Sequence, residues 1–285
     1  MVFVWQSVLL LKNLSAKQDT NKFKFVETEK LEFRGERHMT SLYKKSEICF
    51  ALLWIGIYCV GMSLFDNLSK AIGLENSVSA VFALVASVFL FLWIRKSNLT
   101  EYFGLRKTTA PAKAFLFFIP LVLISLSNVW SGFSLNYGSV QLVCFIVKML
   151  CVGFLEEIIF RGFLFRAMSK DNVKSAIIVS SVTFGIGHVI NLLNGSGMNL
   201  ADNIFQIIAA VFIGFLYVII FYRGGSLIPC ILSHGVLNSL SAFANSEAPE
   251  TEVLIFRMVL LIVLVAGYAL ILLKTLPPKK ATSEQ

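Results

Sequence analysis

Apolar residues occur in eight runs along the chain, each near the length that spans a bilayer. The runs cover residues 47–66, 76–94, 112–130, 139–166, 174–194, 203–222, 226–244 and 253–273. An α-helix rises about 1.5 Å per residue, so roughly 20 apolar residues cross the hydrocarbon core of a membrane. The pattern therefore predicts an all-α fold: a polytopic transmembrane helical bundle of about eight spans.

The composition agrees with a membrane protein rather than a water-soluble one. Hydrophobic residues make up 56% of the 285 residues, and the mean hydropathy is +0.76. A net charge of +8 would suggest a nucleic-acid partner for a soluble protein, but here the basic residues lie between apolar runs, as in cytoplasmic loops. We therefore expect a lipid bilayer and no nucleic acid as partner. The five cysteines all lie in apolar runs without a Cys-x-x-Cys motif, which indicates buried thiols rather than disulfides or metal ligands.

Basic residues gather in alternate connections between the runs. They are Lys44, Lys45, Arg95, Lys96, Arg106, Lys107, Lys113, Arg166, Lys170, Lys174, Arg223, Lys274, Lys279 and Lys280. The other connections are mainly acidic, with Lys70 and Arg257 as exceptions, and Arg257 could snorkel from the outer end of the last run. Because Lys and Arg are enriched on the cytoplasmic side, we expect a multi-pass protein of the cell membrane with both termini in the cytosol.

The chain divides into four predicted parts. Residues 1–38 are mixed and polar, and we interpret them as a non-native or disordered leader with Met39 as the true start, a hypothesis that N-terminal sequencing of the native protein tests. Codons for Arg34–Glu36 can spell a bacterial ribosome-binding sequence before Met39. Residues 39–110 hold the first membrane helices, residues 111–245 form a core with the candidate site, and residues 246–285 form the last helix and a basic cytosolic tail.

Two adjacent glutamates, Glu156 and Glu157, lie inside the fourth apolar run. A carboxylate within a membrane is costly, which makes an ionisable residue there a candidate for function. Arg161 follows Glu157 by one helical turn, so these two side chains share a face and can pair. Glu156 points elsewhere without that partner and is available for chemistry. Lys148, in the same run, we interpret as structural, either paired with an acid or snorkelling.

His188, His234 and Asn238 are polar residues inside other apolar runs. A histidine in a membrane helix often only hydrogen-bonds a neighbouring helix, but here the depths agree. Glu156 is 14 residues from Lys170, His188 is 14 from Lys174, and His234 is 11 from Arg223, which corresponds to roughly 17–21 Å along each helix, with Asn238 at about 22 Å. The sequence thus predicts a polar site at one level inside the bundle.

Such a site can support peptide-bond hydrolysis. A buried carboxylate can take a proton from water and return it to a leaving amine, while a histidine and an amide can hydrogen-bond the developing oxyanion. Alternatively, Glu156, His188 and His234 could hold zinc, since two histidines and one glutamate form a known catalytic set. No His-Glu-x-x-His motif occurs. Ser233 is a weak nucleophile candidate, because adjacent residues on a helix point in different directions.

These residues resemble the motifs of the CPBP intramembrane proteases, which include type II CAAX prenyl endopeptidases and the Abi proteins of bacteriocin processing and immunity. Glu156–Arg161 resembles Glu-Glu-x-x-x-Arg, Phe184–His188 resembles Phe-x-x-x-His, and His234–Asn238 resembles His-x-x-x-Asn. The resemblance covers about residues 110–245. It implies that Glu156 and His188 activate water, that His234 and Asn238 form the oxyanion hole, and that Glu157, Arg161 and Phe184 support the site. This mechanism needs no metal, and we favour it over zinc.

The first hypothesis is therefore an intramembrane endopeptidase of the bacterial plasma membrane that acts on peptides or membrane proteins. The alternative is a non-enzymatic membrane protein, either a bacteriocin-immunity factor or a modulator of a sensor kinase, with a membrane sensor or a peptide-export protein as partner. A transporter is a weaker reading, because no inverted repeat with broken helices is visible. The complete set of Glu156, His188, His234 and Asn238 favours the enzyme, since a binding protein does not need them all.

Overall fold

The computed structural model describes residues 38–193, 200–245 and 251–277. The chain divides into two units, residues 1–46 and residues 47–285. Within the first unit, residues 38–45 are helical. The predicted leader falls almost entirely on residues 1–37, which lie outside the described residues, so that prediction stays untested.

Helices make up almost all of the described part of the second unit. The α-helices are α2 (Glu47–Ala71), α3 (Ser77–Lys96), α4 (Ile119–Ser125), α5 (Ser139–Glu156), α6 (Arg166–Ser169), α7 (Val173–Gly187), α8 (Ile190–Leu193), α9 (Leu200–Gly224), α10 (Ile228–Leu240) and α11 (Thr251–Thr275). Short 3₁₀ segments are η1 (Ala112–Phe118), η2 (Ser127–Val129) and η4 (Ser241–Phe243), and η3 (Glu157–Phe165) is π-helical. No strand occurs among the described residues, so the predicted all-α fold is confirmed.

Four of these helices are long and apolar enough to cross a membrane: Glu47–Ala71, Ser77–Lys96, Leu200–Gly224 and Glu252–Thr275. Three more apolar runs of the sequence form shorter helices. The run at 112–130 is broken because Leu116, Phe117 and Phe118 have positive φ angles, which few residues other than glycine adopt. Together the long apolar helices suggest a multi-pass membrane protein.

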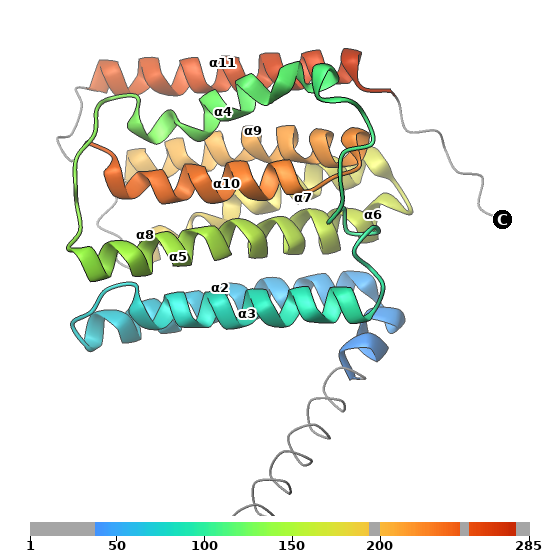
Figure 1. Ribbon diagram of the computed structural model, residues 1–285, viewed down its shortest axis with the longest axis horizontal. Coiled ribbons are helices and arrows are strands. Elements are labelled where there is room, and N and C mark those ends of the chain that lie inside the picture. The colour runs from blue at the N-terminus through green and yellow to red at the C-terminus, as the bar shows by residue number, and fades with distance from the viewer. Residues whose placement is uncertain (1–37, 194–199, 246–250, 278–285) are drawn as a thin grey trace, which may run out of the picture. The chain divides into compact units, whose positions relative to one another are not determined.

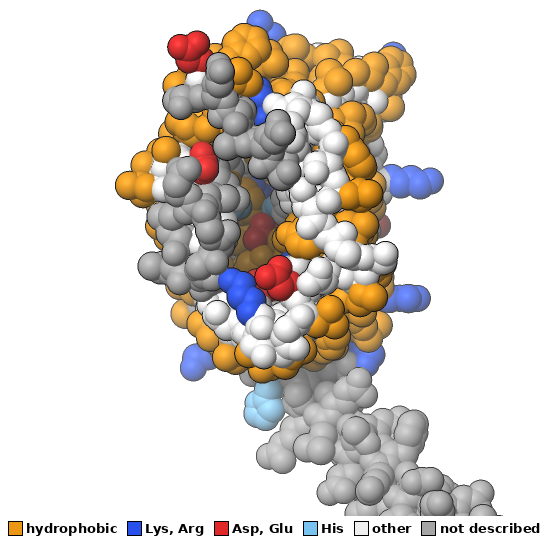
Figure 2. Space-filling model, turned by 90° about the vertical axis from the view of Figure 1, so that its left-hand side faces the viewer, with side chains coloured by type: hydrophobic (Ala, Val, Ile, Leu, Met, Phe, Trp, Pro, Cys, Tyr) orange, Lys and Arg blue, Asp and Glu red, His pale blue; other side chains and the backbone are white. Residues whose placement is uncertain are grey.

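Large apolar side chains cover much of the outer surface of the long helices. On α2, α3 and α11, residues such as Leu52, Val60, Val81, Val85 and Val263 are more than half exposed, and the sides of the molecule in Figure 2 are correspondingly hydrophobic. Exposed apolar surface of this extent is unfavourable in water. It is the surface expected of helices that face lipid.

The helices of the second unit run along a common direction in layers (Figure 1). Helices α2 and α3 form one outer layer, α5 follows, then α7, α9 and α10, and α4 and α11 form the opposite outer layer. Helix α5 packs against both α3 and α10, and α9 packs against α7 and α11. The fourth apolar run, with its glutamates, is therefore in the middle of the unit.

Glycines allow the central helices to approach closely. A Cβ atom added at Gly153 of α5 would lie 2.6 Å from the backbone nitrogen of Gly235 on α10. A Cβ at Gly185 of α7 would lie 3.0 Å from the backbone of α9, at the carbonyl of Ile207. Small residues at such crossings are typical of membrane helix packing. The contact between Gly153 and Gly235 brings the glutamates of the α5–η3 segment beside His234.

We expect Gly153→Ala to destabilise the protein, because the added methyl group meets backbone atoms that cannot move aside. Overpacking of this kind costs about 1–3 kcal/mol. Gly267→Ala is the matched control, since nothing lies within 4 Å of a Cβ at Gly267 of α11. The measurement is the thermal unfolding temperature of both variants in detergent. Equal unfolding temperatures for the two variants would show that α5 and α10 do not pack as closely as described.

Candidate active site

Glu157 and Arg161 form a fully buried ion pair at the start of the π-helical segment. Arg161 Nη1 donates to Glu157 Oε1 over 3.0 Å, and neither side chain is exposed to solvent. The guanidinium carbon also lies 4.1 Å from the centre of the Phe184 ring, a favourable cation–π distance. The structure thus pairs Glu157 with Arg161, as their spacing predicts, and holds Phe184 of α7 against the pair. A π-helical turn at this point is of the kind often found at functional sites.

His234 of α10 lies between the two glutamates. Its Nδ1 is 2.9 Å from Glu157 Oε1, and its Nε2 is 3.3 Å from Glu156 Oε2. A neutral imidazole carries one N–H and an imidazolium carries two. With a proton on each nitrogen, the ring donates from Nδ1 to Glu157, which fixes its orientation, and its Nε2–H points toward Glu156. This arrangement links the supporting ion pair to the glutamate that the sequence assigns to chemistry.

Tyr58 of α2 is a site residue that the sequence reasoning missed. Its hydroxyl donates to Glu156 Oε1 over 2.6 Å, whereas the buried Oε2 of Glu156, 3.3 Å from His234 Nε2, accepts no hydrogen bond from a described residue. The available signal was a tyrosine inside an apolar run, since a buried tyrosine hydroxyl usually has a hydrogen-bond partner. The sequence could not say that this partner would be Glu156, 98 residues away.

His188 reaches the site from the C-terminal end of α7. Its Nδ1 is 3.1 Å from the carbonyl oxygen of Phe184, and Asn203 donates to the His188 carbonyl over 3.0 Å. Because a carbonyl only accepts, the contact with Phe184 places the proton on Nδ1 and leaves Nε2 of a neutral ring as an acceptor. No hydrogen bond joins His188 to Glu156 within the described residues. Both side chains instead face the same cavity.

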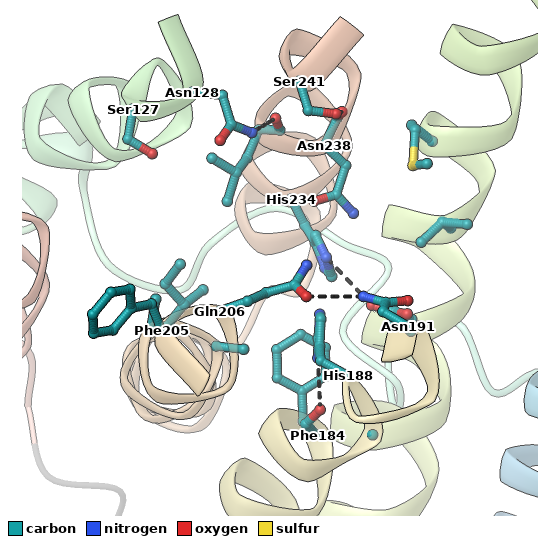
Figure 3. Close-up of a pocket in the computed structure, with 18 of the residues that line it drawn as sticks. Ser127, Asn128, Phe184, His188, Asn191, Phe205, Gln206, His234, Asn238 and Ser241 are labelled. Carbon is teal, nitrogen blue, oxygen red and sulfur yellow. Dashed lines mark hydrogen bonds and ion pairs between the residues drawn. The ribbon is translucent and has the colours of Figure 1, made fainter. Parts of the chain in front are cut away.

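A cavity of about 610 Å³ contains the four candidate catalytic residues in its wall: Glu156, His188, His234 and Asn238. Figure 3 shows His188 pointing into it from one side and His234 and Asn238 from another. The side-chain amide of Asn238 makes no hydrogen bond with any other described residue, so it remains available to a ligand. The structure therefore brings together all four residues that the sequence placed at one depth.

Lys148 of α5 pairs with an acid, as the structural interpretation of the sequence expected. Its Nζ lies 3.0 Å from Asp66 Oδ1 of α2, and the two side chains are 7% and 31% exposed. Both residues line the cavity. On α2, Asp66 follows Tyr58 by eight residues, and on α5, Lys148 precedes Glu156 by eight residues, because the two helices run antiparallel. The Lys148–Asp66 pair and the Tyr58–Glu156 hydrogen bond form two polar contacts between these helices along the cavity wall.

Ser233 does not meet the geometry of a nucleophile paired with His234. Its hydroxyl lies 2.9 Å from the hydroxyl of Tyr217 and 2.8 Å from that of Ser125, in a buried network outside the cavity wall. The ring nitrogens of His234 face the glutamates instead. Adjacent residues on α10 thus point in different directions, as the helix geometry requires.

The zinc alternative does not fit the arrangement of the side chains. Across residues 38–193, 200–245 and 251–277, no three His, Cys, Asp or Glu side chains are grouped so as to hold a metal ion. Both ring nitrogens of His234 face carboxylates, and Glu156 is held by Tyr58 and His234. A ligand set of Glu156, His188 and His234 would need these contacts to be broken.

Comparison with known protein families agrees with these motifs. Residues 138–240 match the family model described as type II CAAX prenyl endopeptidase Rce1-like. The stretch from α5 to α10 is thus similar to an Rce1-like CAAX protease domain. Comparisons with curated proteins and with solved structures gave no match. The resemblance that the sequence motifs indicated is therefore confirmed for this domain.

The Rce1-like domain begins at the start of α5 and ends with α10. It includes both glutamates, Arg161, both histidines and Asn238. Helix α2 lies outside the matched residues, although it supplies Tyr58 and Asp66 to the cavity wall. The cavity wall thus combines the matched residues with others that precede and follow them, from α2, η2 and α11.

Proposed function

We propose that this protein is an intramembrane endopeptidase that hydrolyses peptide bonds in peptide or membrane-protein substrates. The observation that carries the proposal is the position of Glu156, which contacts His234 and lines one cavity with His188 and Asn238 inside an Rce1-like domain. A carboxylate, an acceptor nitrogen and two hydrogen-bond donors around a cavity are the groups that hydrolysis by activated water requires.

In the proposed reaction, Glu156 and Nε2 of His188 hold a water molecule, and Glu156 takes one of its protons. The resulting hydroxide attacks the carbonyl carbon of the peptide bond and forms a tetrahedral intermediate with a negative oxygen. His234, with a proton on each ring nitrogen, donates a hydrogen bond to that oxygen from Nε2, and the Asn238 amide donates a second one. Glu156 then gives its proton to the leaving nitrogen as the carbon–nitrogen bond breaks, which restores the ionised carboxylate. Glu157 keeps Nδ1 of His234 occupied, so that Nε2 is the nitrogen presented to the substrate.

Asn238→Ala should slow hydrolysis by roughly a hundred- to a thousand-fold, the usual cost of one lost oxyanion donor. Folding should be unaffected, because the amide makes no hydrogen bond to another described residue. The exposed Asn67 of α2 provides the control variant Asn67→Ala, which removes an amide outside the cavity. The measurement is kcat in proteoliposomes with a cleavable reporter peptide. Equal rates for the two variants would remove Asn238 from the oxyanion site.

We expect active protein to contain no stoichiometric zinc, because Glu156 accepts a hydrogen bond from Tyr58 and both ring nitrogens of His234 face glutamates. Elemental analysis of purified, active protein is the measurement, together with an assay after chelation and dialysis. Zinc binding depends on its ligands, so one zinc per chain that is lost in Glu156→Gln, His188→Ala and His234→Ala would contradict the metal-free mechanism.

The membrane placement belongs to the same proposal. We place the protein in a bacterial plasma membrane, with about eight helical passes and both termini in the cytosol. Its substrates are to be found by comparing the membrane proteome and released peptides of cells with the wild type and with a Glu156 variant. In the alternative role, as a bacteriocin-immunity factor or a partner of a membrane sensor, the Glu156 variant would retain the cellular phenotype.

A further inference from the structure

The cavity opens at one end of the second unit, where its wall includes several polar residues beside the apolar Trp130 and Leu254. Ser127 and Asn128 follow α4, Asp202 lies in the first turn of α9, Ser241 follows α10, and Arg257 lies in the second turn of α11. These helix ends lie together on the left of Figure 1, and Figure 2, which views that side, shows the hollow with an acidic side chain inside it. Further along the cavity the wall includes Phe160, Phe184 and Ile213. Water and substrate therefore have an entrance with polar side chains at this end, which we call the mouth.

The opposite end of the same helices carries most of the positive charge. Its lysines and arginines are Arg95, Lys96, Arg106, Lys107, Lys113, Arg166, Lys170, Lys174, Arg223 and Lys274. None of them lines the cavity. In the described residues at the mouth end, the basic side chains are Lys70 and Arg257, beside the acidic Asp66, Glu75, Asp202 and Glu252. Lysine and arginine mark the cytoplasmic side, whereas acidic residues contribute little to orientation. The end opposite the mouth is thus the cytoplasmic end.

We infer that the mouth faces the extracytoplasmic side of the membrane, and that the substrate is a peptide segment presented from that side. The orientation rests on the charge distribution and on the position of the cavity, whereas the nature of the substrate rests on the proposed function. A peptide exported across the membrane, or the outer segment of a membrane protein, has the chemistry to enter a polar mouth and place a peptide bond beside Glu156. A substrate whose cleavable end lies in the cytosol would approach the basic end of the molecule, where no described residue of the cavity wall lies.

Two matched serine-to-cysteine variants test the orientation. In a background with the native cysteines replaced by alanine, Ser241→Cys places an exposed thiol at the mouth, and Ser175→Cys places an exposed thiol in the first turn of α7 at the basic end. The reagent is a membrane-impermeant maleimide, applied separately to right-side-out and inside-out vesicles. We expect Ser241→Cys to react in right-side-out vesicles and Ser175→Cys in inside-out vesicles. The reverse pattern would overturn the inference.

The native Cys59 tests whether the cavity itself is reached from the mouth. Cys59 lines the cavity next to Tyr58, whereas Cys230 is buried outside its wall. With the other cysteines replaced, we expect a small charged methanethiosulfonate to modify Cys59 at least tenfold faster in right-side-out than in inside-out vesicles, and to leave a Cys230-only variant unmodified. Faster modification of Cys59 from the inside-out face, or no modification from either face, would contradict the inference.

These labelling results do not depend on peptide hydrolysis. If the protein labels as expected but cleaves no peptide, the outward orientation of the cavity would stand and the proposed function would be wrong. If the protein cleaves peptides but labels in the reverse pattern, the proposed function would stand and the outward orientation of the mouth would be wrong. The two proposals can therefore fail separately.

Discussion

Glu156→Gln is expected to abolish peptide hydrolysis while the protein remains folded in the membrane. The amide has nearly the shape of the carboxylate and can still accept a hydrogen bond from Tyr58, but it cannot take a proton from water. Loss of a general base typically costs a factor of 10²–10⁴, and here the same group also protonates the leaving nitrogen. The measurement is kcat of purified protein in proteoliposomes, with circular dichroism and the unfolding temperature as checks on folding.

The control for this variant is Glu75→Gln, because Glu75 is an exposed acid outside the cavity wall. It should hydrolyse the reporter peptide at the wild-type rate. Tyr58→Phe provides an intermediate case: it removes one hydrogen bond to Glu156 and keeps the base, so we expect a smaller loss than in Glu156→Gln. Wild-type kcat in Glu156→Gln would exclude Glu156 as the base and leave the proposed mechanism without its central group.

The sequence was sufficient for the all-α fold class and for choosing four polar residues that the structure places around one cavity. Apolar runs of spanning length predict helices because a membrane leaves the backbone few other structures. Polar residues inside such runs are energetically costly and therefore rare. This allowed four of them to be selected: Glu156, His188, His234 and Asn238. Counting residues from the basic ends then placed them at one level, since helical rise is constant. The structure gathers these four around one cavity.

Other features depend on contacts that no local pattern contains. Whether an apolar run forms one spanning helix or a broken one depends on backbone angles such as those at Leu116–Phe118. Tyr58 and Asp66 contact α5 only because α2 packs along the cavity, and the sequence gives no reason to choose that neighbour. The position of His234 between two glutamates likewise follows from the close approach at Gly153 and Gly235, which is visible only after the helices have been packed.

Glu157→Ala is expected to reduce both the amount of folded protein and its activity. Arg161 would be left as a buried cation without its carboxylate, and removal of one partner of a buried ion pair typically costs about 3–5 kcal/mol. His234 would also lose the acceptor that fixes its Nδ1, so its Nε2 would no longer be held toward the substrate. The measurements are abundance in membranes by immunoblot, the unfolding temperature, and kcat of whatever protein is recovered.

The double variant Glu157→Leu with Arg161→Met separates these two effects. Replacement of a whole buried ion pair by apolar side chains is often neutral for stability or even favourable, so abundance and unfolding temperature should return toward those of the wild type. Activity should stay low, because His234 still lacks its carboxylate partner. Recovery of both stability and activity in the double variant would show that Glu157 serves only to neutralise Arg161. Normal abundance with full activity in Glu157→Ala would instead contradict the buried pair itself. Among the described residues, Glu157 is the carboxylate that pairs with Arg161, whose guanidinium otherwise lies against the rings of Phe184 and Tyr217.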